Sequence, residues 1–226
     1  MKTVLSIAVL ILSFVLTAAA QTGEQAPILE KDVQYKDWTY KSVRDDGREM
    51  NLRELARGKK LVLVVYYAPW CPNWRNEAPI AQKLYEKYKA SGLEVVGVGE
   101  YDTVEKMKAN LETLKITFPV VYESDALDAK QKTLHYTYRK TTGDTRNWGS
   151  PWNIFLEPNK LEKKGDVLLS KAHVVNGELI ETEAEAFIRQ KLGLSAATED
   201  KKVAETNEKP IEPCTPEKKV AEFKKP

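Results

Sequence analysis

Cysteine and histidine are both scarce in this sequence, which has two of each among 226 residues. Two cysteines, Cys71 and Cys214, form at most one bridge, so a fold built on a disulfide framework is excluded. His135 and His173 stand at no ligand spacing from each other or from the cysteines, so no metal site is predicted. The Gly97-Val-Gly99 pair lacks the third glycine of a nucleotide-binding fingerprint, and no cofactor is predicted.

An excess of either charge is also absent. The chain has 35 Lys and Arg against 33 Asp and Glu, a formal net charge of +2, which gives no electrostatic basis for binding nucleic acid. Apolar residues make up 42% and charged residues 30% of the chain, as in a soluble globular protein. The length accommodates one domain of ordinary size plus tails.

The N-terminal apolar segment, Val4–Leu16, is too short to span a bilayer, at roughly 13 residues against the ~20 required. It follows Lys2 and precedes the small residues Ala18–Ala20, a pattern typical of a secretory signal peptide over residues 1–20. An uncleaved membrane anchor is the alternative. Cleavage predicts an exported protein without stable membrane insertion, located in the periplasm or cell envelope or secreted.

A single stretch, residues 61–79, carries the chemistry. Leu61–Val65 is continuous, apolar and rich in β-branched residues, which predicts a central strand buried on both faces. Cys71 follows at the mouth of a predicted helix, with Pro72 close to the first-turn position that tolerates proline. Because a thiol there lies at the positive end of the helix dipole, its thiolate is favoured and its pKa should fall.

The string from Trp70 to Pro79, WCPNWRNEAP, resembles the W-C-x-x-C-R-x-E-x-P signature of TlpA-like thiol–disulfide oxidoreductases. These belong to the thioredoxin-like group that also includes the alkyl hydroperoxide reductase and thiol-specific antioxidant proteins. Five signature residues are in place, and Trp74 stands at the position of the second cysteine. The resemblance implies an α/β thioredoxin-like fold, with a central mixed β-sheet flanked by helices and an N-terminal β-hairpin extension.

The predicted elements follow the order expected for that fold. They are strands at Tyr35–Tyr40 and Lys41–Met50 around the Asp45–Gly47 hairpin turn, a short helix at Asn51–Arg57, helices at Trp74–Ala90, Thr103–Lys115, Asp125–His135 and Glu183–Leu192, and strands at Leu93–Val98, Thr117–Val121, Asn153–Glu157 and Val167–Val175. We assign residues 21–33 to a loose lead-in and 34–194 to the thioredoxin-like domain. Residues 195–226, rich in Lys, Glu and Pro with few large apolar residues, are predicted to be a disordered charged tail.

The region before the strand at Asn153 departs from the family. Tyr136–Gly149 reads as a connection longer and more polar than usual. Ser150-Pro151-Trp152 then stands where the family carries its cis-proline loop opposite the cysteine. The resemblance implies a cis Pro151 whose neighbour's backbone is free to bind an extended substrate chain; an ordinary trans loop proline is the alternative.

The missing second motif cysteine sets the mechanistic question. In two-cysteine relatives the first thiolate attacks a substrate disulfide and the second releases the mixed disulfide. Here Trp74, one helical turn from Cys71, should occupy the space of the second sulfur. Cys71 then requires an external thiol reductant, or Cys214 acts as the resolving thiol, because a tail of ~20 residues reaches roughly 25 Å. The alternative is that Cys214 is incidental.

Glu77 is the second catalytic candidate. The resemblance implies a carboxylate that borders the site, tunes the acidity of Cys71 and shuttles a proton; a first-turn acid that complements the helix dipole is the plainer interpretation. The substrate-binding candidates are Ser150, Pro151 and the tryptophans Trp70, Trp74, Trp148 and Trp152. The tryptophans form either a groove wall or part of the core, and the loop positions of Trp148 and Trp152 favour the wall.

Three functions remain open. The favoured hypothesis is an exported oxidoreductase that uses Cys71 as its single active-site nucleophile on disulfides or oxidised thiols of extracytoplasmic proteins. A one-cysteine peroxidase is less favoured, because Val64 and Ala68 stand where peroxiredoxins carry the proline and threonine of P-x-x-x-T-x-x-C. The third hypothesis is a non-enzymatic thioredoxin-fold binding module, for which Trp74 is the main argument.

Overall fold

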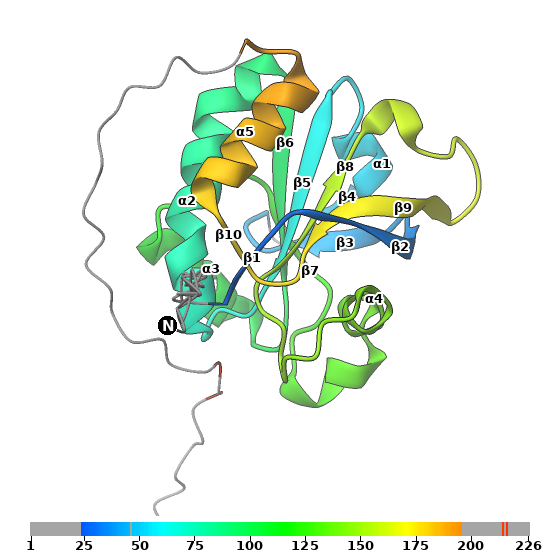
Figure 1. Cartoon of the computed structure of the whole chain (residues 1–226). Coiled ribbons are helices and arrows are strands. Elements are labelled where there is room, and N and C mark those ends of the chain that lie inside the picture. Colours follow the sequence, from blue (N-terminus) through cyan, green and yellow to red (C-terminus); the bar gives the residue numbers. More distant parts are fainter. Residues whose placement is uncertain (1–23, 46, 196–213, 215, 217–226) are drawn as a thin grey trace, which may run out of the picture.

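The computed structural model describes residues 24–45, 47–195, 214 and 216 (Figure 1). The predicted signal peptide over residues 1–20 and most of the predicted tail lie outside the described residues. In the described part, no helix is both long and apolar enough to cross a membrane.

An eight-stranded mixed sheet forms the centre of the fold, as predicted (Figure 1). β5 is parallel to β6 and antiparallel to β8, and β6 is parallel to β7. The other ladders, β2 with β9, β8 with β9, β3 with β7 and β3 with β4, are antiparallel. In spatial order the strands are β2 (Leu29–Lys36), β9 (Val167–Val175), β8 (Trp152–Leu156), β5 (Leu61–Tyr67), β6 (Leu93–Gly99), β7 (Val120–Tyr122), β3 (Thr39–Ser42) and β4 (Glu49–Asn51).

Helices cover both faces of this sheet. α2 and α5 lie side by side on one face (Figure 1), joined by the ion pairs Lys83–Glu181 and Lys87–Glu185. α4 packs on the other face, against β2. The helices are α1 (Leu52–Leu55), α2 (Pro72–Tyr88), α3 (Val104–Thr113), α4 (Leu134–Thr142) and α5 (Glu181–Leu192), with short 3-10 helices η1 (Lys89–Ser91), η2 (Leu127–Lys132) and η3 (Pro158–Lys160).

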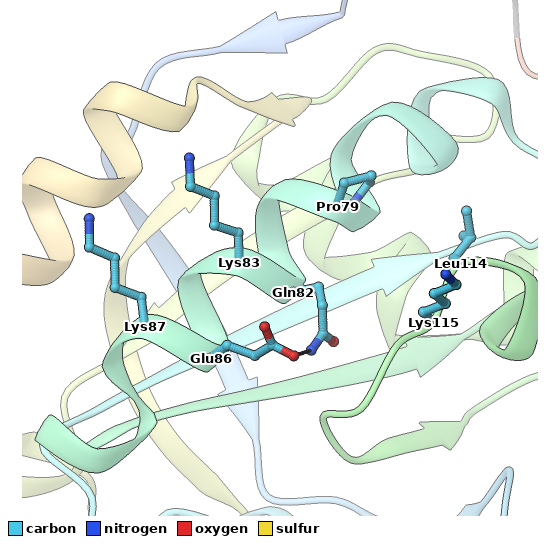
Figure 2. Close-up of a pocket in the computed structure, with 7 residues that line it drawn as sticks. All are labelled: Pro79, Gln82, Lys83, Glu86, Lys87, Leu114 and Lys115. Atoms are coloured by element: carbon cyan, nitrogen blue, oxygen red, sulfur yellow. Dashed lines mark hydrogen bonds between the residues drawn. The ribbon is translucent and has the colours of Figure 1, made fainter.

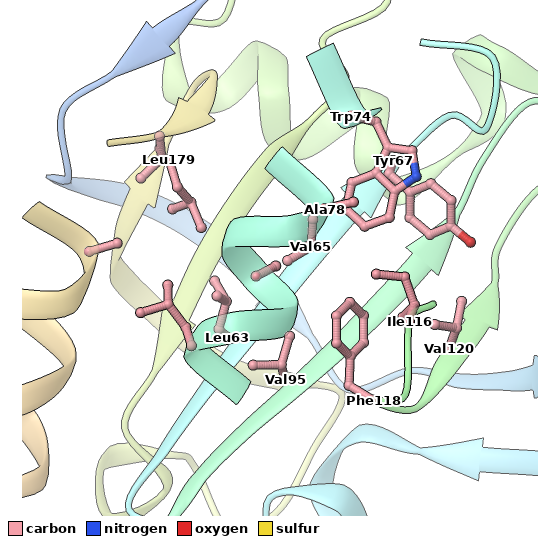
Figure 3. Close-up of a cluster of buried hydrophobic side chains, with 14 of the residues drawn as sticks. Leu63, Val65, Tyr67, Trp74, Ala78, Val95, Ile116, Phe118, Val120 and Leu179 are labelled. Atoms are coloured by element: carbon pink, nitrogen blue, oxygen red, sulfur yellow. The ribbon is translucent and has the colours of Figure 1, made fainter. Parts of the chain in front are cut away.

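The central strand β5 divides the core in two. Because alternate side chains of a strand point to opposite faces, Leu63, Val65 and Tyr67 pack beneath α2 in one apolar cluster (Figure 3). Val62 and Val64 belong to the second cluster, on the α4 side of the sheet. All of β5 is buried, which confirms the prediction for residues 61–65 and extends the strand to Tyr67.

The predicted lead-in over residues 21–33 is wrong for its described part. A two-residue strand, β1 (Gln25–Ala26), pairs in parallel with β10 (Glu178–Leu179), and β2 begins at Leu29. Val33 is buried, so this segment belongs to the folded domain. Strand β2 lies at the edge of the sheet and contains several charged residues, so it lacks the alternation of apolar and polar residues from which strands are predicted.

The predicted strand Tyr35–Tyr40 divides at Asp37. β2 ends at Lys36, and β3 is the next-to-last strand at the other side of the sheet. The Asp37 carboxylate between them accepts from the Asn51 amide and the Arg53 backbone N–H, which anchors the turn. The hairpin predicted around Asp45–Gly47 is confirmed, with β3 and β4 as its strands.

The predicted polar connection Tyr136–Gly149 is wrong in its first half, which is helix α4. Thr133 caps the helix through its hydroxyl, and η2 occupies much of the helix predicted at Asp125–His135. The buried residues of α4 are His135, Tyr138, Arg139 and Thr142, at the i, i+3, i+4 and i+7 spacing of an amphipathic helix. Because three of the four are polar, hydrophobic periodicity does not reveal them.

Candidate functional site

Cys71 is the N-cap residue of α2, directly after the β5 loop. Its backbone N–H donates to the Ala68 carbonyl over 3.0 Å, and Pro72 occupies the first helical position. This is the arrangement that the sequence predicts: the missing N–H of proline costs nothing there, and the chain turns directly from strand into helix. The Cys71 sulfur therefore lies at the positive end of the α2 dipole.

Cys214 forms a disulfide with Cys71, across a sequence separation of 143 residues and a Cα–Cα distance of 4.8 Å. The sequence left open whether Cys214 is a resolving thiol or an incidental one, and the structure places it at the helix mouth. Both sulfurs face the Ser150 carbonyl oxygen, at 3.1 Å from Cys71 Sγ and 3.5 Å from Cys214 Sγ. Three distant segments thus meet at one point.

The Ser150–Pro151 peptide bond is cis, as predicted. The Ser150 hydroxyl accepts from the Ala68 backbone N–H over 2.8 Å, which ties this loop to the chain just before Cys71. The side chains of Ser150 and Pro151 are both buried, so the groups they bring next to the sulfurs are backbone atoms.

Two of the four tryptophans proposed to bind substrate are fully buried, so the prediction is wrong for them. Trp74 stacks on Tyr67 at a ring-centroid distance of 4.3 Å and donates from Nε1 to Asn110 Oδ1 over 2.9 Å (Figure 3). Trp152 belongs to β8 rather than to a loop, and its ring packs on the α4 side of the sheet. Both rings are enclosed by core side chains, which leaves neither of them a surface for a bound chain to contact.

The other two tryptophans lie together. The half-buried rings of Trp70 and Trp148 meet edge to face at a centroid distance of 5.2 Å. Trp70 donates to the Tyr101 carbonyl over 3.2 Å, and the Lys130 ammonium lies 4.4 Å from the Trp148 ring centroid. This pair joins the segment before Cys71 to the segment before Ser150, and its role as a wall of a substrate groove stays a prediction.

Glu77 is completely buried on α2, less than two helical turns after Cys71. Its Oε2 accepts from the Leu179 backbone N–H over 2.7 Å and from the Asn153 amide over 3.0 Å, while Oε1 has no partner among the residues that the structure describes. Burial raises the pKa of Glu77 to about 8, although these two hydrogen bonds favour the ionised form. The carboxyl is therefore mostly protonated at pH 7 and titrates close to neutrality.

Sequence reasoning missed two asparagines that organise the site. Asn153 lies on β8, opposite Val65 of β5. Its side-chain amide donates both to Glu77 Oε2 and to the Gly177 carbonyl, and so links the two. Asn110 of α3 accepts from Trp74 and donates to the Pro69 carbonyl over 3.1 Å, which fixes the loop before Cys71. Neither belongs to a local motif, and only the tertiary arrangement reveals them.

A depression of about 660 Å³ lies elsewhere, along the exposed side of α2 (Figure 2). It does not adjoin Cys71, and its lining residues are Pro79, Gln82, Lys83, Glu86, Lys87, Leu114 and Lys115. Among the residues that the structure describes, no group of three or more His, Cys, Asp or Glu side chains is arranged to hold a metal ion.

Several curated relatives match the chain over part of its length, and two of them serve as examples. The thioredoxin-like protein YneN of Bacillus subtilis is 32% identical over 120 residues, 51% of this chain and 62% of that protein. The thiol-disulfide oxidoreductase ResA of Halalkalibacterium halodurans is 30% identical over 78 residues, 34% of this chain and 43% of that protein. The chain thus spans less than two thirds of the length of either relative.

Solved structures confirm the thioredoxin-like fold. A secreted thiol-disulfide isomerase from Corynebacterium glutamicum aligns with a TM-score of 0.54 at 16% identity, covering 73% of this chain and 92% of that one. The thioredoxin domain of a thiol-disulfide oxidoreductase from Bacteroides vulgatus aligns with a TM-score of 0.52 at 21% identity, covering 73% and 99%.

The comparison with protein families gives a match to more than half of the chain. The family is described as AhpC/TSA, and the matched residues, 23–142, include the central strand, Cys71 and the whole of α2. The resemblance drawn from the residues around Cys71 is therefore confirmed, and the chain belongs to the AhpC/TSA family.

Proposed function

We propose that this protein is a thiol–disulfide oxidoreductase in which Cys71 attacks and Cys214 resolves. One observation carries the proposal: a cysteine at a helix N-terminus forms a disulfide with the second cysteine beside the Ser150 backbone carbonyl. This differs from the single-cysteine mechanism favoured by the sequence, because the structure supplies an intramolecular partner for Cys71. The sequence contains no third cysteine for that task.

The reaction is two successive exchanges. The Cys71 thiolate attacks one sulfur of a substrate disulfide, forming a mixed disulfide while the other substrate sulfur leaves as a thiolate and takes up a proton. The Cys214 thiolate then attacks Cys71 Sγ, which releases the second substrate thiol and leaves the Cys71–Cys214 disulfide. The substrate gains two electrons and the protein loses two, so an external thiol reductant must regenerate it; the reverse sequence oxidises a substrate dithiol.

Two features act in opposite directions on the attacking sulfur. The N-terminus of the 17-residue helix α2 favours a thiolate on Cys71. The Ser150 carbonyl oxygen accepts from a thiol but repels a thiolate, and therefore favours the protonated form. A substrate N–H that engages this carbonyl would remove the repulsion, so substrate binding itself promotes ionisation of Cys71.

We assign Glu77 the role of a proton reservoir. Its carboxyl has a pKa of about 8 and can release or accept a proton at the pH at which thiols exchange. It lies six residues after Cys71, about 9 Å along the helix axis, so transfer requires an intervening water. A dipole-complementing role requires an ionised carboxylate and is less well supported, because burial keeps Glu77 mostly protonated at pH 7.

Disulfide exchange explains the site better than peroxide reduction. At the two positions where peroxiredoxins carry proline and threonine, this chain has the buried apolar residues Val64 and Ala68. A site without the threonine hydroxyl lacks a donor to polarise a peroxide. We further propose that the protein is exported and acts on extracytoplasmic protein thiols and disulfides, since an intramolecular disulfide persists in oxidising compartments.

The Cys214→Ser variant tests the proposal. With a peptide that contains one disulfide as substrate, the reduced variant should accumulate a Cys71–peptide mixed disulfide, because no internal thiol displaces the peptide. The reduced wild-type protein should instead release reduced peptide and form the internal disulfide. Mass spectrometry of acid-quenched, alkylated samples distinguishes the two products.

Cys71→Ser is the matched control and should form no adduct through residue 71. The proposal fails if Cys214→Ser releases the reduced peptide at the wild-type rate without a detectable adduct. It also fails if the reduced wild-type protein does not react with the peptide, which would favour a non-enzymatic binding module.

A further inference from the structure

A buried charge cluster lies next to the site, in the segment that the sequence presents as an unusual insertion. Arg139 of α4 is fully buried, and its Nε lies 3.1 Å from Asp144 Oδ2. The Arg146 guanidinium contacts the same carboxylate twice, from Nη2 to Oδ2 over 2.8 Å and from Nε to Oδ1 over 3.0 Å. Burial acts to raise the pKa of Asp144, but the hydrogen bonds and charge of Arg146 outweigh it and keep the carboxylate ionised.

The Arg146 guanidinium connects this segment to the loop that carries Pro151. Besides Asp144, its Nη2 donates to the Pro151 carbonyl oxygen over 2.8 Å, and its Nη1 donates to Glu24 Oε2 over 2.8 Å. Three acceptors from three parts of the chain thus share one planar, five-donor group. A lysine at this position would keep the positive charge but could not reproduce this fork.

The contact with Pro151 matters because of what that loop presents. The preceding carbonyl, of Ser150, faces both sulfurs, and the Ser150 hydroxyl is bonded to the segment before Cys71. Trp148, two residues earlier, packs on Trp70. Arg146 therefore fixes the end of the loop whose backbone and aromatic ring border Cys71.

We propose that Arg146 is a positioning residue that holds the Ser150–Pro151 backbone in register for an extended polypeptide disulfide. The inference deepens the proposed function and rests on it. A polypeptide substrate must align its main chain with this loop while its sulfur reaches Cys71. A small disulfide needs only access to the Cys71 thiolate, so its rate constant per thiolate does not depend on the loop's position.

The experiment compares the two kinds of substrate in Arg146→Met and Arg146→Lys. In both variants the rate constant of reduced Cys71 with a disulfide-containing peptide should fall by roughly ten- to a hundredfold, the effect of a small misplacement of reacting groups. Expressed per Cys71 thiolate, the rate constant with neutral dithiodipyridine should stay within about twofold of wild type. Carrying out both reactions in the Cys214→Ser background limits the observation to the first exchange.

Glu24→Ala is the matched control, because it removes the third Arg146 contact while leaving those to Asp144 and Pro151, and both rate constants should match wild type. Equal losses for both substrates would indicate a purely structural role and overturn the inference, as would full recovery of the peptide rate in Arg146→Lys. If Arg146→Met does not fold, the Arg146→Lys comparison decides. Failure of the wild-type protein to react with peptide, by contrast, overturns the proposed function itself.

Discussion

Replacing Gly149 with alanine is expected to lower the free energy of unfolding by about 3–5 kcal/mol, at the upper end of single-residue effects. Gly149 has a φ of +59°, a conformation that costs an alanine about 1–2 kcal/mol. A Cβ atom there would also overlap the guanidinium of Arg139, which is buried and held by Asp144. Because the Arg139 guanidinium cannot move away without breaking its buried ion pair with Asp144, the overlap adds to the backbone strain. Urea unfolding at neutral pH measures the effect.

Gly143→Ala is the matched control. Gly143 ends α4 with a φ of +85°, but a Cβ atom would meet no atom of the described residues within 4 Å. Only the backbone penalty remains, so a loss of about 1 kcal/mol is expected. The account of a rigid, closely packed loop before Ser150 is contradicted if Gly149→Ala costs no more than Gly143→Ala.

The free energy of unfolding of Glu77→Gln, measured relative to that of the wild-type protein, should increase as the pH rises from about 5 to 8. The folded protein holds the Glu77 proton up to a pKa of about 8, whereas the unfolded chain releases it near the ordinary value of 4.5. Between these values the native state binds more protons, so the wild-type free energy of unfolding falls with rising pH. Glutamine does not titrate, and the difference between the two proteins should grow by a few kcal/mol across this range.

Urea titrations at pH 5, 6.5 and 8 measure this difference. Glu185→Gln is the control, because the pKa of Glu185 is lowered by folding whereas that of Glu77 is raised. Hydrogen bonds from Lys87 and Tyr88 lower the pKa of Glu185, so its stabilising effect is already complete at pH 5. Glu185→Gln should therefore lower the free energy of unfolding by the same amount at all three pH values. A difference between Glu77→Gln and wild type that is likewise independent of pH would show that Glu77 is ionised in the folded protein, and the proton reservoir would then be excluded.

The parts of the fold that the sequence predicts correctly are those encoded locally. A continuous β-branched run predicts the buried strand β5, and Pro72 marks the start of α2 with Cys71 as its cap. Gly58 and Gly92 end their segments with positive φ, as turn glycines do. These signals, together with the motif around Cys71, are sufficient to place the attacking thiol.

The parts that could not be predicted depend on distant partners. Nothing local indicates that Cys214 meets Cys71, because a pair 143 residues apart is set by the whole fold. Arg139 and Arg146 lie in a segment that the sequence presents only as a polar connection, and their ion pairs with the buried Asp144 are seen only in the structure. The predicted strand begins at Asn153, one residue later than β8, so Trp152 was assigned to the loop. As the first residue of the strand, it faces the core instead.

The most direct test of the account is a redox titration of the full chain in defined dithiol–disulfide buffers, with alkylation and peptide mapping by mass spectrometry at each potential. A two-cysteine couple predicts one reversible two-electron transition, in which the peptides containing Cys71 and Cys214 are linked in the oxidised form and both alkylated in the reduced form. Two alkylated cysteines at every potential, or oxidation that links Cys71 only to other molecules, would contradict the central claim that Cys71 and Cys214 are one redox pair.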